Sequence, residues 1–454
     1  MKKVHIISIG GAVMHNIAIQ LARKGYKVTG SDDILFDPSL SRLKRAGLYP
    51  DKMGWDEERI SKDLDFVILG MHAKKDNPEL QRALELGVSV FSFPEFIGQQ
   101  AKGQKRIVVS GSHGKTTTSS MIVHLLNRLG VETDYLIGAQ IEGVSDVVRF
   151  DNNPYFVIEG DEYPSSAVDN QSKFMHYDPH YVIITGIAWD HMNIFPTYEN
   201  YFNTFVKFMG NLSKGSTVIF NSNDAEVVRL MEGFDSVNKI PYGVLPYTIT
   251  KGKFNIIGKY PLHVIGKHNI SNLTAAITLC EELGFEESDL FSAAQSYSGA
   301  SKRLEVLLEN DNGTSFIDFA HAPSKVKASV NAVKELDKDN PLVAVLELHT
   351  YSSLNKDFLP EYKDTLSNAD RAVVMYDPKI VSNKNMESLN EAIVKESFNR
   401  PDLIVVNSSD GLKMEIQKIF RSLPSNRINS IFMSSGNFGG TDIKSFVENL
   451  KVGY

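Results

Sequence analysis

The sequence predicts an α/β fold built as three domains, and three observations lead to this prediction. Short apolar runs typical of β-strands recur along the 454 residues, and many are followed by segments with helical periodicity. Most of these runs are apolar on both faces, as strands are in a parallel sheet covered by helices. Two stretches rich in polar or small residues, 98–105 and 298–305, interrupt the alternation. We therefore expect a Rossmann-like domain over 1–100, a central domain with a mostly parallel sheet over 101–300, and a second Rossmann-like domain over 301–454.

Composition and charge predict a globular protein. The net charge is -7, with 42% hydrophobic and 23% charged residues, which is ordinary for a globular protein and argues against a nucleic-acid partner. No segment approaches the ~18 consecutive apolar residues of a membrane span, so we expect no span and a cytoplasmic location. The single cysteine, Cys280, shares a predicted helical face with Leu273 and Ile277, and we expect it to be a buried thiol.

The first predicted strand runs into a glycine turn and a helix, in the stretch VHIISIGGAVMHNIA. Gly10 and Gly11 would let a pyrophosphate approach the start of that helix. Asp32 ends the second predicted strand, where an acidic side chain meets a ribose hydroxyl in dinucleotide-binding folds. The full glycine fingerprint is missing, and an NAD-binding domain has a similar pattern. An NAD-dependent oxidoreductase therefore stays open as a distant alternative.

The first strand of the central domain leads into the stretch SGSHGKTTT. Residues 111–116 form the expected turn and 116–129 the helix after it. The glycines let backbone N–H groups approach phosphate oxygens, Lys115 would reach the terminal phosphates, and the Thr116 hydroxyl would bind Mg²⁺. The pattern predicts a loop for the β- and γ-phosphates of a nucleoside triphosphate. It is a variant, because Val109 stands where the usual motif has its first glycine; the alternative is a glycine turn with a solvated lysine.

Acidic residues follow two further strands. Glu159, Asp161 and Glu162 close the stretch FVIEGDEY, and Asp190 and His191 follow the strand in ITGIAWDHM. The carboxyl ends of parallel strands meet at the edge where ligands bind, so we expect these groups near the phosphate loop, where they could hold Mg²⁺. A solvated acidic turn and a structural histidine are the alternatives.

Two asparagines, Asn269 and Asn272, precede the predicted Cys280 helix in the stretch IGKHNISNLTAAI. An asparagine amide can both donate to and accept from the edge of adenine. Asparagine is also a good helix N-cap, so capping is the alternative role.

Taken together, six motifs in this order resemble the Mur ligase superfamily, the ATP-dependent amide ligases of peptidoglycan precursors. They are SGSHGKTTT, IEGDEY, WDHMNIF, GKHNISNLTAA, SGASKRLE and DFAHAPS. The N-terminal stretch is similar to the UDP-sugar domain of the muramate branch. The resemblance implies a UDP-sugar-binding domain over 1–100, a P-loop ATP-binding domain over 101–300 and a peptide- or amino-acid-binding domain over 301–454.

Within that branch, two activities fit the resemblance. One ligase adds L-alanine to UDP-N-acetylmuramate; the other, a recycling enzyme, adds the tripeptide L-alanyl-γ-D-glutamyl-meso-diaminopimelate to the same sugar. The segment EGDEYPSSAVDNQSKFMHYDP, with Lys173, Phe174, His176 and Tyr177, is more similar to the recycling enzyme, as is SSGNFGG at 434–440. The tripeptide is therefore the first expectation and alanine the alternative.

The resemblance also implies roles for individual residues, with ATP and Mg²⁺ as cofactors. Lys115, Glu159 and His191 would be catalytic, and Thr116, Glu159 and His191 would hold the metal. ATP would be bound by Gly111, Ser112, His113, Gly114, Lys115, Thr116, Thr117, Asn269, Asn272, Arg303 and Asp318. The UDP-sugar would be bound by Gly10, Gly11 and Asp32.

The chain departs from the family pattern at several positions. Gly186 and Ala188 stand where Asn and Glu are usual before Asp-His, and Ala322 replaces the second histidine of His-His-Pro. Ser8 replaces the first glycine of the N-terminal loop, and residues 349–355 replace an arginine-bearing loop that helps to read the incoming amino acid.

The reaction implied is activation of the muramyl carboxylate by ATP as an acyl phosphate, followed by attack of the acceptor amine. We expect the third domain to close over the site and exclude water, with a hinge near Gly299. A nucleotide-driven switch or transporter ATPase is a rival that explains the Lys115 loop, but not the UDP-like first domain or the third domain.

Overall fold

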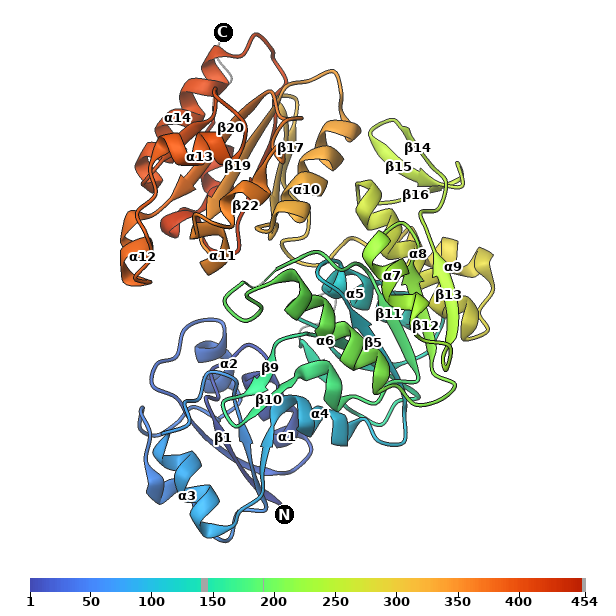
Figure 1. The fold of residues 1–454 in the computed structure, drawn as a ribbon, viewed down its shortest axis with the longest axis vertical. Helices are drawn as coiled ribbons and strands as arrows, with labels where there is room; N and C mark the ends of the chain where they lie inside the picture. The colour runs from blue at the N-terminus through green and yellow to red at the C-terminus, as the bar shows by residue number, and fades with distance from the viewer. Residues whose placement is uncertain (140–145, 191, 451–454) are drawn as a thin grey trace.

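The computed structural model describes residues 1–139, 146–190 and 192–450. Within these residues the chain forms three main sheets, one after another along the sequence, and the predicted α/β fold with mostly parallel sheets is confirmed. Figure 1 shows the N-terminal body at the bottom, the central body in the middle and the C-terminal body at the top. The predicted domain limits near 100 and 300 remain predictions.

The N-terminal body is a parallel sheet of order β2-β1-β3-β4, because every strand pair in it runs in the same direction. Asn77 shows how the sequence starts a helix here: its side chain accepts the amide hydrogens of Glu79 and Leu80, and Pro78 takes the first helical position. The elements are β1 (Lys3–Ile7), α1 (Met14–Arg23), β2 (Lys27–Ser31), α2 (Ser39–Arg45), η1 (Glu57–Arg59), β3 (Phe66–Leu69), α3 (Pro78–Leu86), β4 (Val90–Ser92) and α4 (Phe93–Gln100).

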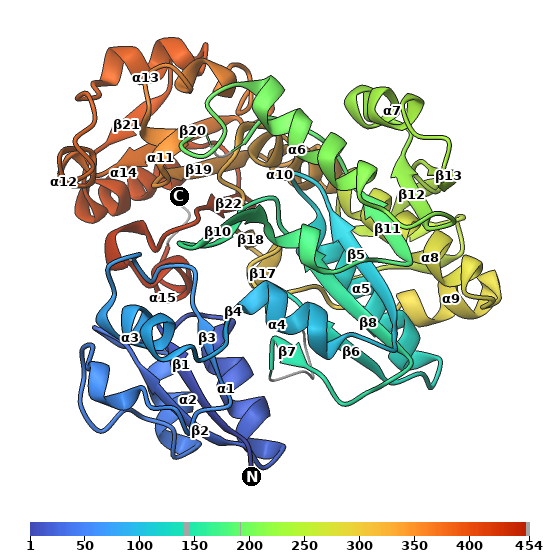
Figure 2. The ribbon, with the colours of Figure 1, turned by 60° about the horizontal axis from the view of Figure 1, so that its bottom comes forward.

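The central sheet has the order β13-β12-β11-β5-β8-β6-β7, and only its edge strand β7 is antiparallel within the described chain. Strand β5 lies between β8 and β11, so the ends of these three strands meet at one edge (Figure 2). The strands are β5 (Lys105–Ser110), β6 (Thr133–Leu136), β7 (Val148–Arg149), β8 (Tyr155–Gly160), β11 (Tyr181–Ile184), β12 (Thr217–Asn221) and β13 (Asn238–Tyr242). The helices are α5 (Lys115–Arg128), η2 (Lys173–His176), α6 (Tyr198–Gly210), α7 (Ala225–Glu232), α8 (Lys267–Glu282) and α9 (Glu287–Ala294).

Two small antiparallel sheets accompany the central body. They consist of β9 (Pro164–Ser166) with β10 (Asp169–Ser172), and of β14 (Tyr247–Thr250), β15 (Lys253–Ile256) and β16 (Tyr260–Pro261). Helices α5 and α8 pack against each other, and Cys280 on α8 is fully buried, as predicted. Burial raises the pKa of the Cys280 thiol to about 12, which fits an inert core residue.

The C-terminal body is a sheet of order β17-β18-β22-β19-β20-β21, parallel except for the β17–β18 hairpin. All seven residues of β19 are buried, as expected for a central strand covered on both faces. The strands are β17 (Glu305–Asn310), β18 (Gly313–Asp318), β19 (Leu342–Leu348), β20 (Arg371–Tyr376), β21 (Ile404–Val406) and β22 (Asn429–Met433). The helices are α10 (Pro323–Leu336), α11 (Tyr351–Leu354), η3 (Leu359–Tyr362), α12 (Pro378–Asn383), α13 (Glu391–Ser397), α14 (Ser409–Ser422), η4 (Phe438–Gly440) and α15 (Ile443–Glu448).

The central body contacts both the N-terminal and the C-terminal body. Helix α10 of the C-terminal body contacts α8 of the central body, and α1 and α4 of the N-terminal body contact β7 and β9. None of the described helices is both long enough and apolar enough to cross a membrane.

Candidate active site

The predicted phosphate loop lies between β5 and α5, at the carboxyl edge of the central sheet. Gly111 and Gly114 have φ values of +131° and +79°, which favour glycine. A Cβ atom at either position would also clash, with Thr185 at Gly111 and with Asn272 at Gly114. The two glycines therefore permit both the backbone path of the loop and its close packing against neighbouring strands and helices. Helix α5 begins at Lys115, one residue earlier than predicted.

The loop is anchored to the segment that follows β11. The Ser112 amide donates to the Gly186 carbonyl over 2.9 Å, and the Ala188 amide donates to Ser112 Oγ over 2.7 Å. Thr185 Oγ1 donates to the His113 carbonyl. A Cβ atom at Gly186 would lie 2.9 Å from the His113 ring. Glycine at this position, which departs from the family pattern, therefore leaves room for the ring.

Lys115 is buried and bound on two sides. Its Nζ donates to the Gly111 carbonyl over 2.6 Å and to Glu162 Oε2 over 3.0 Å, and it lies 3.7 Å from Asp161 Oδ1. Burial opposes its charge, but the carboxylates of Glu162, Asp161 and Glu159 outweigh burial and raise the pKa of Lys115 above its usual value. The ammonium therefore stays charged at neutral pH, at the edge where phosphates bind helix N-termini.

Glu162 belongs to a buried polar network that sequence reasoning did not resolve. The Tyr201 hydroxyl lies 3.1 Å from Glu162 Oε1 and 2.8 Å from Ser112 Oγ. Glu162 itself is fully buried. The carboxylate proposed from sequence as a Mg²⁺ ligand thus holds the loop lysine in this structure, and Tyr201 connects it to the loop.

Thr116 and Glu159 form the oxygen-rich part of the site. Thr116 Oγ1 donates to Glu159 Oε1 over 2.8 Å, and Glu159 Oε2 accepts the Gly138 amide hydrogen over 2.6 Å. Burial and the nearby charge of Asp161 raise the pKa of Glu159. This pair fits Mg²⁺, because a hydroxyl and a carboxylate are hard oxygen donors and the nearby negative charge of Asp161 favours a cation here.

The third predicted metal ligand, His191, lies outside the described residues. Across 1–139, 146–190 and 192–450, no group of three or more His, Cys, Asp or Glu side chains is arranged to hold a metal ion. Mg²⁺ usually takes one or two carboxylates from the protein and the rest of its ligands from phosphates and water. A metal role for Thr116 and Glu159 stays a prediction.

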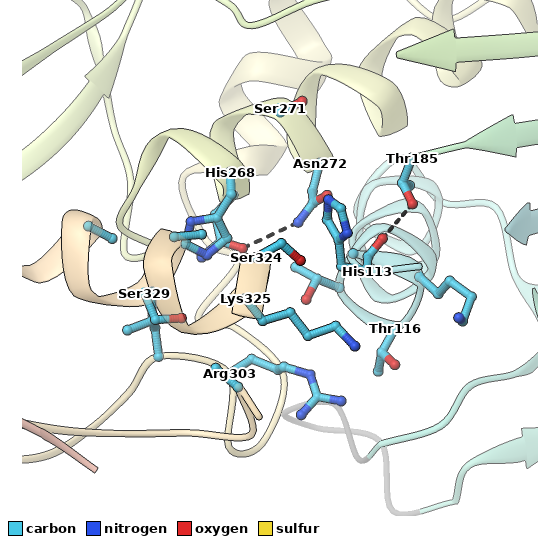
Figure 3. Close-up of a pocket in the computed structure, with 18 of the residues that line it drawn as sticks. His113, Thr116, Thr185, His268, Ser271, Asn272, Arg303, Ser324, Lys325 and Ser329 are labelled. Atoms are coloured by element: carbon cyan, nitrogen blue, oxygen red, sulfur yellow. Dashed lines mark hydrogen bonds between the residues drawn. The ribbon is translucent and has the colours of Figure 1, made fainter. Parts of the chain in front are cut away.

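A cavity of about 860 Å³ opens next to the loop and is walled by the central and C-terminal bodies (Figure 3). Most residues predicted to bind ATP line it, although Gly111 does not. They are Ser112, His113, Gly114, Lys115, Thr116, Thr117, Asn269, Asn272, Arg303 and Asp318, together with Glu159.

The two asparagines lie inside α8 and do not cap it. Gly266 is the N-cap residue, and no side chain in the described part of the chain makes a capping hydrogen bond there. Asn269 Nδ2 instead donates to the Ile265 carbonyl over 2.9 Å, and Asn272 Nδ2 lies 3.4 Å from Asn269 Oδ1. The capping alternative is therefore wrong, and Asn272 faces the cavity beside the loop.

His113 and His268 give the cavity a neutral aromatic wall. Burial lowers the pKa of each ring to about 4. His113 Nδ1 is buried and, among the described residues, has no hydrogen-bond partner. A buried ring nitrogen without a partner is a natural contact point for a polar ligand.

The C-terminal side of the cavity carries Arg303 and Asp318. The Arg303 guanidinium lies 4.7 Å from the centre of the Phe319 ring. Asp318 accepts a hydrogen bond from Ser329, and burial raises the pKa of Asp318. Gly299, the predicted hinge, has φ +106°, and Lys302 and Leu304 also adopt positive φ.

The residues predicted to bind the UDP-sugar lie in the N-terminal body and do not line this cavity. The Gly10 amide donates to Asp32 Oδ2 over 2.7 Å, and the Gly11 amide donates to the Ser8 carbonyl over 3.3 Å. Burial raises the pKa of Asp32. The structure brings Gly10 and Asp32 together, and Ser8 takes a glycine-like φ of +63°. Their role in binding the UDP-sugar stays a prediction.

Sequence reasoning missed three charged residues that line the cavity, Lys267, Lys325 and Glu335, and did not place Lys173. Lys325 lies two residues after Pro323, in the motif HAPSK, and its position next to that motif was the available signal. Lys173 Nζ donates to Asp161 Oδ2 over 3.1 Å and lies 5.4 Å from the centre of the Phe93 ring.

The chain is similar to known proteins over most of its length. The family model "Mur ligase family, catalytic domain" matches residues 3–105, and "Mur ligase middle domain" matches 109–280. The UDP-N-acetylmuramate–L-alanine ligase of Clostridium acetobutylicum is 31% identical over 422 residues, covering 87% of this chain and 89% of its own. The enzyme of the same name from Carboxydothermus hydrogenoformans is 30% identical over 390 residues, covering 82% of each chain.

Solved structures show the same fold at lower identity. The UDP-N-acetylmuramate-alanine ligase of Thermotoga maritima superposes with a TM-score of 0.70 at 20% identity and covers 99% of both chains. A murein peptide ligase from Psychrobacter arcticus gives a TM-score of 0.67 at 21% identity, covering 99% of this chain and 100% of its own.

Proposed function

The chain belongs to the Mur ligase family, and from that premise we propose that it joins UDP-N-acetylmuramate to the amino group of L-alanine. It is an ATP-dependent amide ligase, as the members of this family are. The observation that carries the choice of acceptor is the 31% identity, over 87% of the chain, to a ligase named for L-alanine. This acceptor was the alternative in the sequence analysis, and the comparisons favour it over the tripeptide.

The site chemistry supports this reaction. The muramyl carboxylate forms a bond to the terminal phosphorus of ATP as the bond to ADP breaks. The amine then attacks the acyl carbon, phosphate leaves, and the nitrogen loses a proton. Lys115 would offset charge on the transferring group, and Thr116 with Glu159 would hold Mg²⁺. When bound, Mg²⁺ supplies further charge neutralisation between two anionic reactants.

Two other pieces of the site have roles in this proposal. Gly10, Gly11 and Asp32 would hold the UDP part of the sugar nucleotide in the N-terminal body. Asn272 and His113 would contact the nucleotide base side of the cavity, and Arg303 and Asp318 would act from the C-terminal side. An NAD-dependent oxidoreductase and a switch ATPase are less favoured, because the family models cover both the first and the central bodies.

The tripeptide L-alanyl-γ-D-glutamyl-meso-diaminopimelate is a second candidate acceptor. The observation that favours it is Lys173, which belongs to the segment that resembles the recycling ligase. Its buried ammonium bonds Asp161 and lies between the rings of Phe93 and Tyr163, at 5.4 and 5.7 Å from their centres. An ammonium between the N-terminal body and the phosphate loop is well placed to meet a carboxylate of the substrates.

A phosphate-release assay separates the two acceptors. UDP-N-acetylmuramate and ATP are held fixed, and L-alanine, the dipeptide L-alanyl-γ-D-glutamate and the tripeptide are tested in parallel. We expect L-alanine to give the largest kcat/KM and an amide product detectable by mass spectrometry. A larger kcat/KM with the tripeptide would move the assignment to the recycling activity, and no amide with any acceptor would contradict the ligase assignment itself.

A further inference from the structure

Lys325 forms an ion pair that joins two bodies of the molecule. It lies in the first turn of α10, in the C-terminal body, and its Nζ is 3.4 Å from Asp190 Oδ2 in the central body. The two side chains are 24% and 7% exposed. Asp190 follows β11, the strand beside β5, so this pair lies at the same sheet edge as the phosphate loop.

The ammonium of Lys325 extends into the cavity from the side opposite the loop. Figure 3 shows Lys325 and Arg303 reaching from the C-terminal body towards Thr116 at the start of α5. Burial lowers the pKa of His113, and the charge of Lys325 lowers it further.

On the central side two lysines line the cavity: Lys115 in the phosphate loop, and Lys267, which is exposed, at the start of α8. Lys115 is shared between the Gly111 carbonyl and Glu162, and Asp161 and Glu159 add negative charge close by. A nucleoside triphosphate that enters this region needs further positive groups besides Mg²⁺. Arg303 and Lys325 are the cations that the C-terminal body supplies to the cavity lining.

The ion pair between Lys325 and Asp190 is one that a phosphate can displace. Its 3.4 Å separation is longer than the ~2.7–2.9 Å typical of charge-assisted hydrogen bonds, and a partly exposed pair of this kind is weak. A terminal phosphate offers several oxygens and a higher negative charge than one carboxylate, so it is the stronger partner for an ammonium in the same cavity.

We propose that Lys325 recognises the terminal phosphate of the nucleotide, exchanging Asp190 for that phosphate and so linking the C-terminal body to the loaded central site. The inference rests on the proposed function, since it requires ATP in the loop. It assigns to Lys325 a preference for triphosphate over diphosphate, because ADP lacks the group that the ammonium takes. After phosphoryl transfer and product release, the pair with Asp190 re-forms.

The test is a comparison of nucleotide affinities by calorimetric titration of the full chain. Two ligands are titrated, each with Mg²⁺: ADP, and the non-hydrolysable imido analogue of ATP. The variant Lys325→Met removes the charge and keeps most of the side-chain length, and Lys325→Arg keeps the charge. The variant Lys115→Ala is the control in which nucleotide binding by the phosphate loop is lost. Lys327→Met is the matched control, because Lys327 lies on the same helix but is exposed and does not line the cavity.

For Lys325→Met, we expect affinity for the ATP analogue to fall about tenfold, the size of one charge-assisted contact, while ADP affinity changes less than about twofold. Lys325→Arg should retain the preference for the triphosphate, and Lys327→Met should match the parent protein. Higher salt should shrink the difference between the parent and Lys325→Met, because it screens the charge removed.

Equal losses for both nucleotides, or no loss for either, would overturn the role of Lys325. In that case binding by the parent protein and its loss in Lys115→Ala would leave the proposed function standing. If the parent protein binds neither nucleotide, the proposed function fails and this inference fails with it. Thermal unfolding of each variant shows whether a lost affinity comes from a lost fold.

Discussion

At Glu159, protonation of the carboxylate and binding of a cation are coupled. Its carboxylate is buried, accepts hydrogen bonds from Thr116 and the Gly138 amide, and faces the charge of Asp161. Burial and the charge of Asp161 raise its pKa above the ordinary 4.5, although the two hydrogen bonds oppose this, so in the metal-free protein a proton competes for the oxygens that would bind Mg²⁺. The competition makes cation binding sensitive to pH.

We predict that Mg²⁺ affinity falls as the pH is lowered towards the raised pKa of Glu159, with the loss beginning above pH 4.5. The sign follows because the protonated carboxyl cannot ligate a cation and binding must release its proton. Titration of Mg²⁺ over a pH series, with proton release measured in two buffers, checks this. Glu159→Gln should bind Mg²⁺ weakly with little pH dependence; a Gln variant that kept the parent pH profile would remove Glu159 from the metal site.

Many of the candidate site residues could be predicted from the sequence, but their contacts could not. The loop residues, the acidic strand ends and the two asparagines were found from local patterns, because glycine turns, strand ends and helix starts are short-range features. The partners of these residues were not found. Lys115 meets Glu162 47 positions away, and Lys325 meets Asp190 135 positions away. Such pairs depend on which strands become neighbours, and the local sequence does not specify that.

At the scale of elements, the order of strands and helices followed from apolar periodicity, and the parallel character of the sheets from strands apolar on both faces. Helix α8 is the instructive exception. Its start offered two asparagines as N-caps, yet Gly266 takes that position and Asn272 lies within the helix beside Gly114. The start of α8 therefore follows the close approach of Asn272 to the loop and not the capping preference of asparagine.

The two ends of α5 offer a matched pair of glycines for testing the loop. Gly114 begins the helix with φ +79° and Gly130 follows it with φ +80°, so alanine is similarly strained at both, by about 1–2 kcal/mol. A Cβ at Gly114 would clash with Asn272, whereas at Gly130 no heavy atom of the described residues lies within 4 Å.

We predict that Gly114→Ala and Gly130→Ala both lower the free energy of unfolding, but that only Gly114→Ala weakens ATP binding, by about tenfold or more because it displaces loop and Asn272 together. Denaturant unfolding and nucleotide titration of both variants give the two quantities. Equal nucleotide affinity in the two variants would mean that the close packing of loop and α8 does not matter for binding.

At the scale of the whole molecule, the cavity has walls from the central and C-terminal bodies, and the residues predicted to bind the sugar nucleotide lie in the N-terminal body. The motifs and their order predicted three bodies, and the function assigned to each body stays a prediction. The sequence did not predict the ion pair between Lys325 of the C-terminal body and Asp190 of the central body, and closure of the C-terminal body around the substrates stays a prediction. The arrangement suits a reaction in which three substrates meet and water must be kept from an activated acyl group.

The central claim is that the phosphate loop presents ATP to a carboxylate of the sugar nucleotide, which takes the terminal phosphoryl group. The most direct measurement uses UDP-N-acetylmuramate with heavy oxygen in that carboxylate, ATP with ordinary oxygen, and the acceptor amine. If the carboxylate attacks phosphorus, one heavy oxygen must leave with the phosphate, and mass spectrometry will find singly labelled phosphate in proportion to the amide formed. Unlabelled phosphate released together with amide would contradict the account.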